Sequence, residues 1–269
     1  GSRSFSITCE AQPLPAAMES LSLLVNPWQV SLPCWLGAVL VKEVALQCMD
    51  WGVRIMGRYI EPMPSRKASK GVYQRPLDFM DYLYLSINAV IETIFTGHLL
   101  HFLWYSLEVE RSFGALGLLN GPVALWLVIV FNDMFYTPLH RLLHMPMLYR
   151  WIHKHHHRVT YPQRGNVDAR NEHPVEQLLA MTFWYCALQL ATCLVGMHAI
   201  VVVLHTSIMV FGTCFNHTEN DLKFSVFGIE FEVRAHEMHH RMPSKNFGQI
   251  CMLFDKLMGT YIPYMIAED

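Results

Sequence analysis

The sequence has few charged residues and little net charge. Asp, Glu, Lys and Arg make up 16% of its 269 residues, whereas soluble proteins average about 25%. The formal net charge is -2, so no basic field favours nucleic acid as a partner. Hydrophobic residues make up 52% of the chain. This composition is typical of a protein whose surroundings are lipid rather than water.

Charged residues are missing altogether from two long stretches, 112–132 and 177–218. The first stretch is long enough for one membrane span, and the second, interrupted by Gly196, is long enough for two helices in a hairpin. Apolar stretches at about 79–106 and 30–49 predict a long span and a span or interfacial helix. A soluble all-helical core is the alternative, but uncharged runs of this length are hard to bury in so small a protein.

These stretches predict an all-α membrane bundle of about four to five apolar helices. We expect residues 30–269 to form a single membrane domain. The segment 1–29 has no initiator Met, so it is expected to be a flexible tag remnant or the mature end left by a removed targeting peptide. None of the seven cysteines belongs to a CxxC motif, which argues against a zinc ribbon or redox motif and favours reduced thiols.

The distribution of basic residues predicts the orientation of the spans. The loop at about 50–78 is rich in Arg and Lys, whereas the turn at about 107–112 is not. By the positive-inside rule, the loop faces the cytosol or its organellar equivalent, and the turn faces the other side. Counting spans from that loop brings all the histidine-rich sequence to one membrane face. The site is therefore expected to be built from 140–173 and 217–240.

Six of the fifteen histidines lie within eighteen residues, HRLLHMPMLYRWIHKHHH. A purification tag, a pH sensor, a nucleic-acid contact and a metal site can all contain such a run, and the spacing distinguishes them. His140 and His144 are four residues apart, so on a helix they can reach one metal ion. Pro138 could start that helix or kink the span before it.

Two further motifs repeat a helical spacing. In HKHHH, His153, His156 and His157 fall on one helical face, and His155 falls off it. In HEMHH, the corresponding positions are His236, His239 and His240. With the first pair, these motifs give eight imidazoles, which are too many for one ion and predict two.

Two other histidines are candidate ligands for the same ions. His217, in FNHTEN, follows the uncharged hairpin, and His173, in NEHP, precedes it. Four histidines within the apolar stretches are expected to have structural roles instead; these are His98, His101, His198 and His205.

The histidine motifs resemble those of a known family. HRLLH, HKHHH and HEMHH, followed by NFGQICMLFDKLMGTY, are similar to the histidine boxes of the fatty acid hydroxylase superfamily, which includes sterol desaturases and C4-sterol methyl oxidases. The resemblance covers about 125–262. It implies a non-haem centre of two iron ions, replaceable by zinc in purified protein, that uses O2 to attack a lipid C–H bond. Hydroxylation, desaturation and oxidative demethylation all remain open.

The resemblance also implies roles for two acids. Asp133, seven residues before His140, matches an acid common in the family. It is expected to accept a hydrogen bond from the second ring nitrogen of a ligand, as metal-bound imidazoles usually require. Glu176, in NEHPVE, is expected to do the same.

Electrons are expected to come from another protein, because residues 1–30 are too few for a fused cytochrome b5 domain. The resemblance implies cytochrome b5 with its reductase, or a ferredoxin in an organelle. The expected location is the endoplasmic reticulum membrane, or a plastid or mitochondrial membrane if a targeting peptide has been removed. A lipid substrate would enter from the bilayer along span residues with large rings, for which the candidates are Phe131, Phe135, Tyr136, Phe183 and Trp184.

Two other classes of protein remain as alternatives. A zinc-dependent membrane hydrolase would use Glu237 as a general base, but HEMHH is not HExxH and the other motifs would be unexplained. A catalytically silent subunit of a larger membrane complex could retain the fold, although missing histidines would then be expected.

Overall fold

The structure is a computed structural model that describes residues 31–64 and 75–266. The expectation for residues 1–29 lies outside this part of the chain. Within it the protein is mostly helical, and five helical segments are long and apolar enough to cross a membrane. They are Leu32–Gly57 (α2), Phe79–Tyr105 (α4), Leu119–Leu143 (η3 and α5), Pro174–Val195 (α8) and Ala199–Asn216 (α9). The prediction of four to five apolar helices is confirmed.

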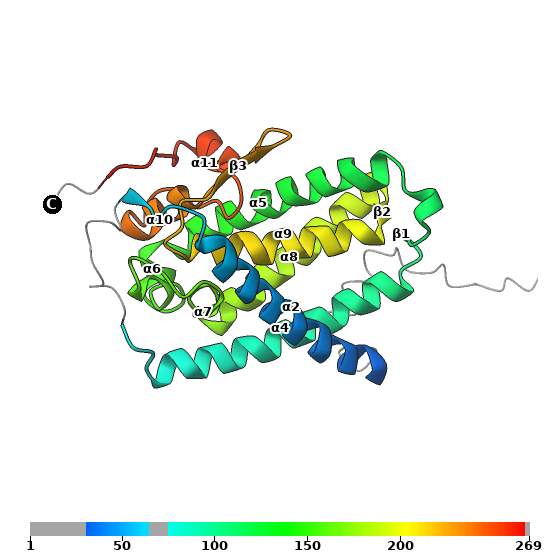
Figure 1. Cartoon of the computed structure of the whole chain (residues 1–269), viewed down its shortest axis with the longest axis horizontal. Coiled ribbons are helices and arrows are strands. Elements are labelled where there is room, and N and C mark those ends of the chain that lie inside the picture. The colour runs from blue at the N-terminus through cyan, green and yellow to red at the C-terminus, as the bar shows by residue number, and fades with distance from the viewer. Residues whose placement is uncertain (1–30, 65–74, 267–269) are drawn as a thin grey trace, which may run out of the picture.

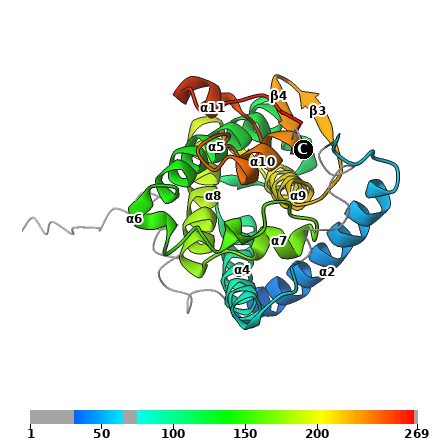
Figure 2. The same ribbon diagram turned by 90° about the vertical axis from the view of Figure 1, so that its left-hand side faces the viewer.

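The spans run between two ends of the molecule, and the histidine-rich segments gather at one of them (Figure 1). The short helices α6 (Pro146–Tyr149), α7 (Asn166–Arg170) and α10 (Val233–Arg241) lie together at this end. The strands β1 (Val109–Glu110) and β2 (Met197–His198) lie at the other end. Figure 2 looks onto the histidine end, where α10 lies beside α9 and α7. The predicted cap on one face of the bundle is confirmed.

The first apolar stretch, which was expected to span or to lie in the interface at about 30–49, continues as one helix to Gly57. This helix, α2, packs along α4 and is long enough to span. The basic loop therefore starts after Gly57 rather than at about residue 50. Arg54 lies within the helix, where it forms an i, i+4 ion pair with Asp50 at 2.8 Å. Residues 65–74 of that loop lie outside the described part.

The third span begins and ends later than the sequence predicts. The π-helical turn η3 (Leu119–Val123) contains Pro122 and precedes α5 (Ala124–Leu143). Before it, the Arg111 guanidinium donates to the carbonyls of Leu103 and Ser106 at 2.7 Å each, which holds the preceding turn in a non-helical path. Pro138 lies inside α5 and does not start a separate helix.

Two small sheets depart from the all-helical expectation. β1 and β2 pair in parallel and join the two turns at the end remote from the histidines. β3 (Lys223–Val226) and β4 (Ile229–Glu232) form a hairpin whose turn residues, Phe227 and Gly228, have φ of 49° and 80°. Positive φ at both turn positions matches the twist of a two-residue hairpin. The hairpin leads directly into α10.

Polar burial in the bundle increases toward the histidine end. The middle of the bundle is apolar, with Val128 of α5 and Leu188 of α8 fully buried. Further along α5, the buried side chains are polar: Asn132, Asp133, Thr137 and His140. Polar side chains buried within a span are costly and mark functional sites by default. The site is therefore sought at this end of α5.

Candidate metal centre

Nine histidines form two clusters at this end of the bundle. In each cluster, one ring nitrogen from every member lies within 4.8 Å of the corresponding nitrogens of the others. The five-histidine cluster consists of His140, His144, His153, His157 and His239. The four-histidine cluster consists of His156, His217, His236 and His240.

Each histidine motif supplies one pair at i, i+4 to a single cluster. The pairs are His140 with His144, His153 with His157, and His236 with His240. The remaining histidines of the two longer motifs, His156 and His239, belong to the opposite cluster from their neighbours. Both of these motifs therefore contribute to both clusters, which ties the two clusters together.

HKHHH does not form the regular helix that its spacing predicts. Lys154 N donates to Tyr149 O at 2.8 Å, and His156 N donates to His153 O at 3.1 Å. His156–Arg158 (η4) then forms a single 3-10 turn. His156 faces the four-histidine cluster while His153 and His157 face the other, as His239 does relative to His236 and His240 in the regular helix α10. The prediction of one shared face was wrong for His156 and, in HEMHH, for His239.

The cluster rings outside the spans favour the neutral form. Burial and the neighbouring imidazole of His140 lower the pKa of His144 to about 2. Burial is also the main cause that lowers the pKa of the other cluster histidines beyond the span ends, which are His153, His156, His157, His217, His236, His239 and His240. Neutral imidazole is the form that binds metal ions.

Backbone carbonyls determine which ring nitrogens carry the hydrogen. In the five-histidine cluster, His140 Nδ1 lies 2.8 Å from Phe247 O, and His239 Nδ1 lies 2.7 Å from Lys245 O. A carbonyl oxygen can only accept, so in both neutral rings Nδ1 must donate and Nε2 must hold a lone pair. This tautomer is inferred from the chemistry of the partner.

The same arrangement occurs in the four-histidine cluster. His217 Nδ1 lies 2.8 Å from Thr213 O, and His240 Nδ1 lies 3.0 Å from Val159 O. Their Nε2 atoms point at the ring of His236, at 3.2 and 3.1 Å. One N–H of His236 cannot satisfy two lone pairs that approach the same nitrogen.

Converging lone pairs favour a bound cation in each cluster. In the five-histidine cluster, His140 Nε2 and His153 Nε2 lie 3.0 Å apart. His239 Nε2 lies 3.0 Å from His157 Nε2 and 3.1 Å from His144 Nε2. Nitrogen ligands at this density suit a metal ion of intermediate softness, such as iron or zinc. The residues therefore fit the two ions that the motifs imply.

The two predicted acids lie close to the clusters in different ways. Glu176 Oε1 lies 2.6 Å from His153 Nδ1, the contact expected of a carboxylate beside a ligand. Asp133 instead accepts from the backbone N–H groups of Ile250 and Cys251, at 3.1 and 2.6 Å. Its carboxylate therefore fixes the loop that follows α10 rather than an imidazole.

His173 lies outside both clusters. Its Nδ1 accepts from Val175 N at 3.2 Å, so the side chain caps the start of α8. Its ring also packs edge-on against Tyr84, with centroids 5.2 Å apart. The segment that supplies ring nitrogens to the clusters therefore ends at His157 and resumes at His217.

Four histidines that the sequence assigns to structural roles also lie outside the clusters. His198 Nδ1 accepts from Ile200 N at 3.2 Å at the start of α9, and His205 Nδ1 accepts from Trp184 Nε1 at 2.9 Å in the core. His98 packs edge-on against Trp35, and His101 packs against Tyr105.

A polar network beside the clusters was not predicted from the sequence. Asp81, in the first turn of α4, is 2% exposed. Its Oδ1 lies 3.0 Å from His155 Nε2 and accepts from Asn171 Nδ2 at 2.9 Å. Arg158 Nη1 lies 3.2 Å from His155 Nδ1. His155 thus faces away from the clusters, as its spacing predicts, and ties the HKHHH turn to α4. A lone Asp at a span start gives no sequence signal for this role.

The aromatic side chains expected to line a lipid groove have several roles. Phe135 stacks on Phe183, with centroids 5.8 Å apart, and Trp184 is buried in the core. Tyr136 lies closest to the site, with its ring centroid 5.1 Å from that of His140. The groove itself stays a prediction.

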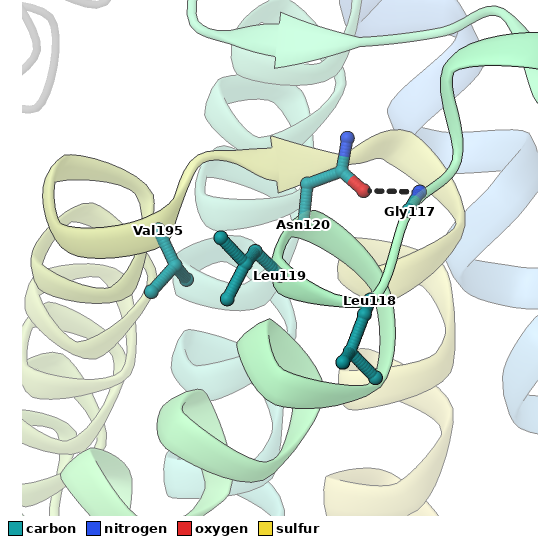
Figure 3. Close-up of a pocket in the computed structure, with 5 residues that line it drawn as sticks. All are labelled: Gly117, Leu118, Leu119, Asn120 and Val195. Atoms are coloured by element: carbon teal, nitrogen blue, oxygen red, sulfur yellow. Dashed lines mark hydrogen bonds between the residues drawn. The ribbon is translucent and has the colours of Figure 1, made fainter.

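A pocket lies at the opposite end of the bundle, where the third span begins and α8 ends (Figure 3). It is lined by Gly117, Leu118, Leu119, Asn120 and Val195. Asn120 Oδ1 accepts from Gly117 N at 2.7 Å, which fixes the turn. This lining has no titratable side chain, so the chemistry is assigned to the histidine end.

Comparison with known proteins agrees with the histidine motifs. Rat methylsterol monooxygenase 1 (Rattus norvegicus) is 28% identical over 138 residues, 50% of this chain and 45% of the relative. Fatty acid hydroxylase ahd1 of Mycosarcoma maydis is 28% identical over 137 residues, 49% of this chain and 32% of the relative. Sphinganine C4-monooxygenase 2 of Arabidopsis thaliana is 30% identical over 136 residues, 48% of this chain and 51% of the relative.

The chain spans about half the length, or less, of these curated relatives. No solved structure matches it significantly. The model of the fatty acid hydroxylase family matches residues 125–260, which is half of the chain and includes all nine clustered histidines. The relatives named above are a methylsterol monooxygenase, a fatty acid hydroxylase and a sphinganine C4-monooxygenase, and the matched region of this chain contains both histidine clusters. The chain belongs to the fatty acid hydroxylase family.

Proposed function

We propose that this protein is a membrane-bound di-iron oxygenase that oxidises a C–H bond of a sterol or fatty acyl lipid with O2 and externally supplied electrons. The observation that carries the proposal is the convergence of neutral imidazole lone pairs in two adjacent clusters. A protein without bound cations would leave buried lone pairs without a donor, because the neutral ring of His236 has one Nε2–H for the two lone pairs of His217 and His240 at 3.2 and 3.1 Å.

The histidines of the two clusters would hold one ion each. When bound, the two iron ions supply O2 activation and share the electrons that this needs. The carbonyls of Phe247, Lys245, Thr213 and Val159 hold the rings with Nε2 inward. Glu176 holds His153 in the same orientation and adds negative charge near the cations.

The position of the clusters favours oxidation close to the polar end of the substrate. His140 lies in the last turn of α5, at the end of a candidate span. The other ligands lie on segments beyond the spans or at their ends. The reacting atom would thus lie near the headgroup level, about 15 Å from the bilayer centre. A carbon near the acyl headgroup or the hydroxyl-bearing sterol ring fits this depth, whereas a terminal methyl group does not.

The zinc-dependent hydrolase is less well supported by the contacts of Glu237. A general base has to face the metal-bound water. Tyr264 Oη donates to Glu237 Oε1 at 3.4 Å, and Arg241 Nη1 lies 3.9 Å from the same oxygen. Neither partner is a cluster residue, so the carboxylate is directed toward the C-terminal segment instead.

Untargeted lipid mass spectrometry of cells with and without the gene tests the proposal. A lipid should change by one oxygen, by two hydrogens or by a lost carbon, which separates hydroxylation, desaturation and demethylation. Cytochrome b5 with its reductase, or ferredoxin, should restore turnover in purified membranes. If no lipid changes while a larger membrane complex falls apart without the protein, the silent-subunit alternative is correct and the oxygenase proposal fails.

A further inference from the structure

The loop 245–251 supplies both backbone carbonyls that orient rings of the five-histidine cluster. Lys245 O accepts from His239 Nδ1 at 2.7 Å, and Phe247 O accepts from His140 Nδ1 at 2.8 Å. The carbonyls that orient rings of the four-histidine cluster come from α9 and from the segment after η4. The two clusters therefore depend on different backbone segments.

Besides Asp133, which holds Ile250 and Cys251, a second buried carboxylate fixes this loop. Asp255, on α11 (Leu253–Met258), is fully buried. Its carboxylate accepts from Phe247 N at 2.9 Å, from Gly248 N at 2.7 Å and from Thr260 Oγ1 at 2.6 Å. All three partners donate, so an ionised carboxylate satisfies them together and at greater strength than a neutral group would.

The loop is packed too closely to move without breaking these bonds. A Cβ at Gly248 would lie 3.1 Å from Asp255 Oδ2 and would collide with the carbonyl oxygen of Cys251. On the other side, Asn246 is fully buried and its Nδ2 donates to Ala235 O at 3.2 Å. The two carbonyls that face the cluster are therefore held at fixed positions.

We propose that Asp255 is a positioning residue for the ion of the five-histidine cluster and acts through the carbonyls of Lys245 and Phe247. The inference rests on the proposed function, because it requires two bound ions. Without the Asp255 carboxylate, Asp133 still holds Ile250 and Cys251, but the part of the loop at Phe247 and Gly248 is released and the carbonyls that accept from the Nδ1–H groups of His140 and His239 are no longer held in place. Their Nε2 atoms are then no longer directed at the ion. The four-histidine cluster keeps its own carbonyls and should retain its ion.

Asp255→Asn tests this directly. The substitution replaces one accepting carboxylate oxygen with an N–H2 group, which is a donor and cannot accept from the backbone N–H or hydroxyl that it faces. The purified wild-type protein should carry two ions per chain, and the variant should retain one after dialysis against a weak chelator. The affinity for the lost ion should fall about 10- to 100-fold, as is typical when a partner behind a ligand is removed. Size-exclusion chromatography in detergent selects the folded protein before its metal content is measured.

The matched control is Glu230→Gln. Glu230 is an exposed acid whose side chain is 59% exposed, and its carboxylate pairs with Lys256, on the same helix as Asp255, at 3.3 Å. This variant should retain both ions. Two ions in both variants would overturn the inference and leave the proposed function intact, whereas fewer than two in the wild type would overturn both.

Double variants identify which ion is lost. Added to His144→Ala, which disables the five-histidine cluster, Asp255→Asn should remove no further ion. Added to His236→Ala, which disables the other cluster, it should remove the ion that remains. Equal losses in both backgrounds, or the reverse pattern, would overturn the inference.

A milder substitution covers the case in which Asp255→Asn does not fold. Thr260→Val removes one hydrogen bond from the carboxylate and leaves its charge in place. It should weaken binding of the same ion by a smaller factor in a chelator competition. Unchanged affinity for both ions would overturn the inference.

Discussion

Acidification is expected to destabilise this protein through its buried histidines. Outside the spans, eight cluster histidines have a pKa lowered from 6.5, mainly by burial. In the unfolded chain each binds a proton as the pH falls through about 6.5. In the folded protein each stays neutral to lower pH. The unfolded state then binds more protons, so the free energy of unfolding falls as the pH falls below about 6.5.

The size of the effect follows from the number of histidines. Each neutral buried imidazole removes about 1.4 kcal/mol of stability per pH unit below its unfolded pKa. Over the first unit below pH 6.5 the unfolded ring is only partly protonated, so each contributes about 1 kcal/mol and eight together would remove about 8 kcal/mol, as much as the whole stability of a typical domain, about 5–15 kcal/mol. Between pH 8 and 7 little should change, because the rings are largely neutral in both states.

Thermal melting of the metal-free protein in detergent at pH 7.5, 6.5 and 5.5 measures this dependence. The melting temperature should fall moderately between the first two values, where about 3 kcal/mol of stability is lost, and more steeply by the third. His156→Gln, which removes one titrating ring, should reduce the loss of unfolding free energy between pH 6.5 and 5.5 by about 1 kcal/mol. A melting temperature that stays constant or rises down to pH 5.5 would refute the conclusion that the rings are held neutral.

Three substitutions give further predictions. Glu176→Gln should weaken binding of one ion about 10- to 100-fold in a chelator competition, because His153 Nδ1 loses a charged acceptor at 2.6 Å; unchanged affinity would contradict this role. His155→Ala should retain two ions and turnover but lower the melting temperature, because its ring bonds Asp81 at 3.0 Å; loss of an ion would place it among the ligands. His217→Ala should remove one ion, and full occupancy with an altered rate would show that it is not a ligand.

The sequence predicts the parts of the fold that depend on composition and spacing. Two uncharged stretches predict three spans, and counting spans from the basic loop predicts that the histidines share one end. The third span starts late because the contacts of Arg111 with backbone carbonyls, made after the chain folds back, keep the preceding residues out of the helix. Periodicity carries no information about such contacts.

The sequence identifies the histidines that form the clusters, but not the contacts that orient their rings. The i, i+4 pairs share clusters, but the i+3 histidines His156 and His239 face the other cluster, because i+3 and i+4 lie on different sides of the helix axis. His173 caps the start of α8. Its place directly before Pro174 fits this capping role as well as it fits the predicted role of a metal ligand. The carbonyls of Lys245 and Phe247 leave no trace in the sequence, because any residue provides a carbonyl. Asp255 lies in a motif that suggests the family but gives no role for the acid.

The metal content of the purified protein tests the central claim most directly. Protein prepared from membranes in mild detergent under reducing conditions should contain two transition-metal ions per chain by inductively coupled plasma mass spectrometry. Iron is expected when the metal is supplied during expression, and zinc can replace it without changing the count. A reproducible content of one ion, or of none after reconstitution with Fe²⁺, would contradict a two-cluster centre and with it the proposed oxygenase.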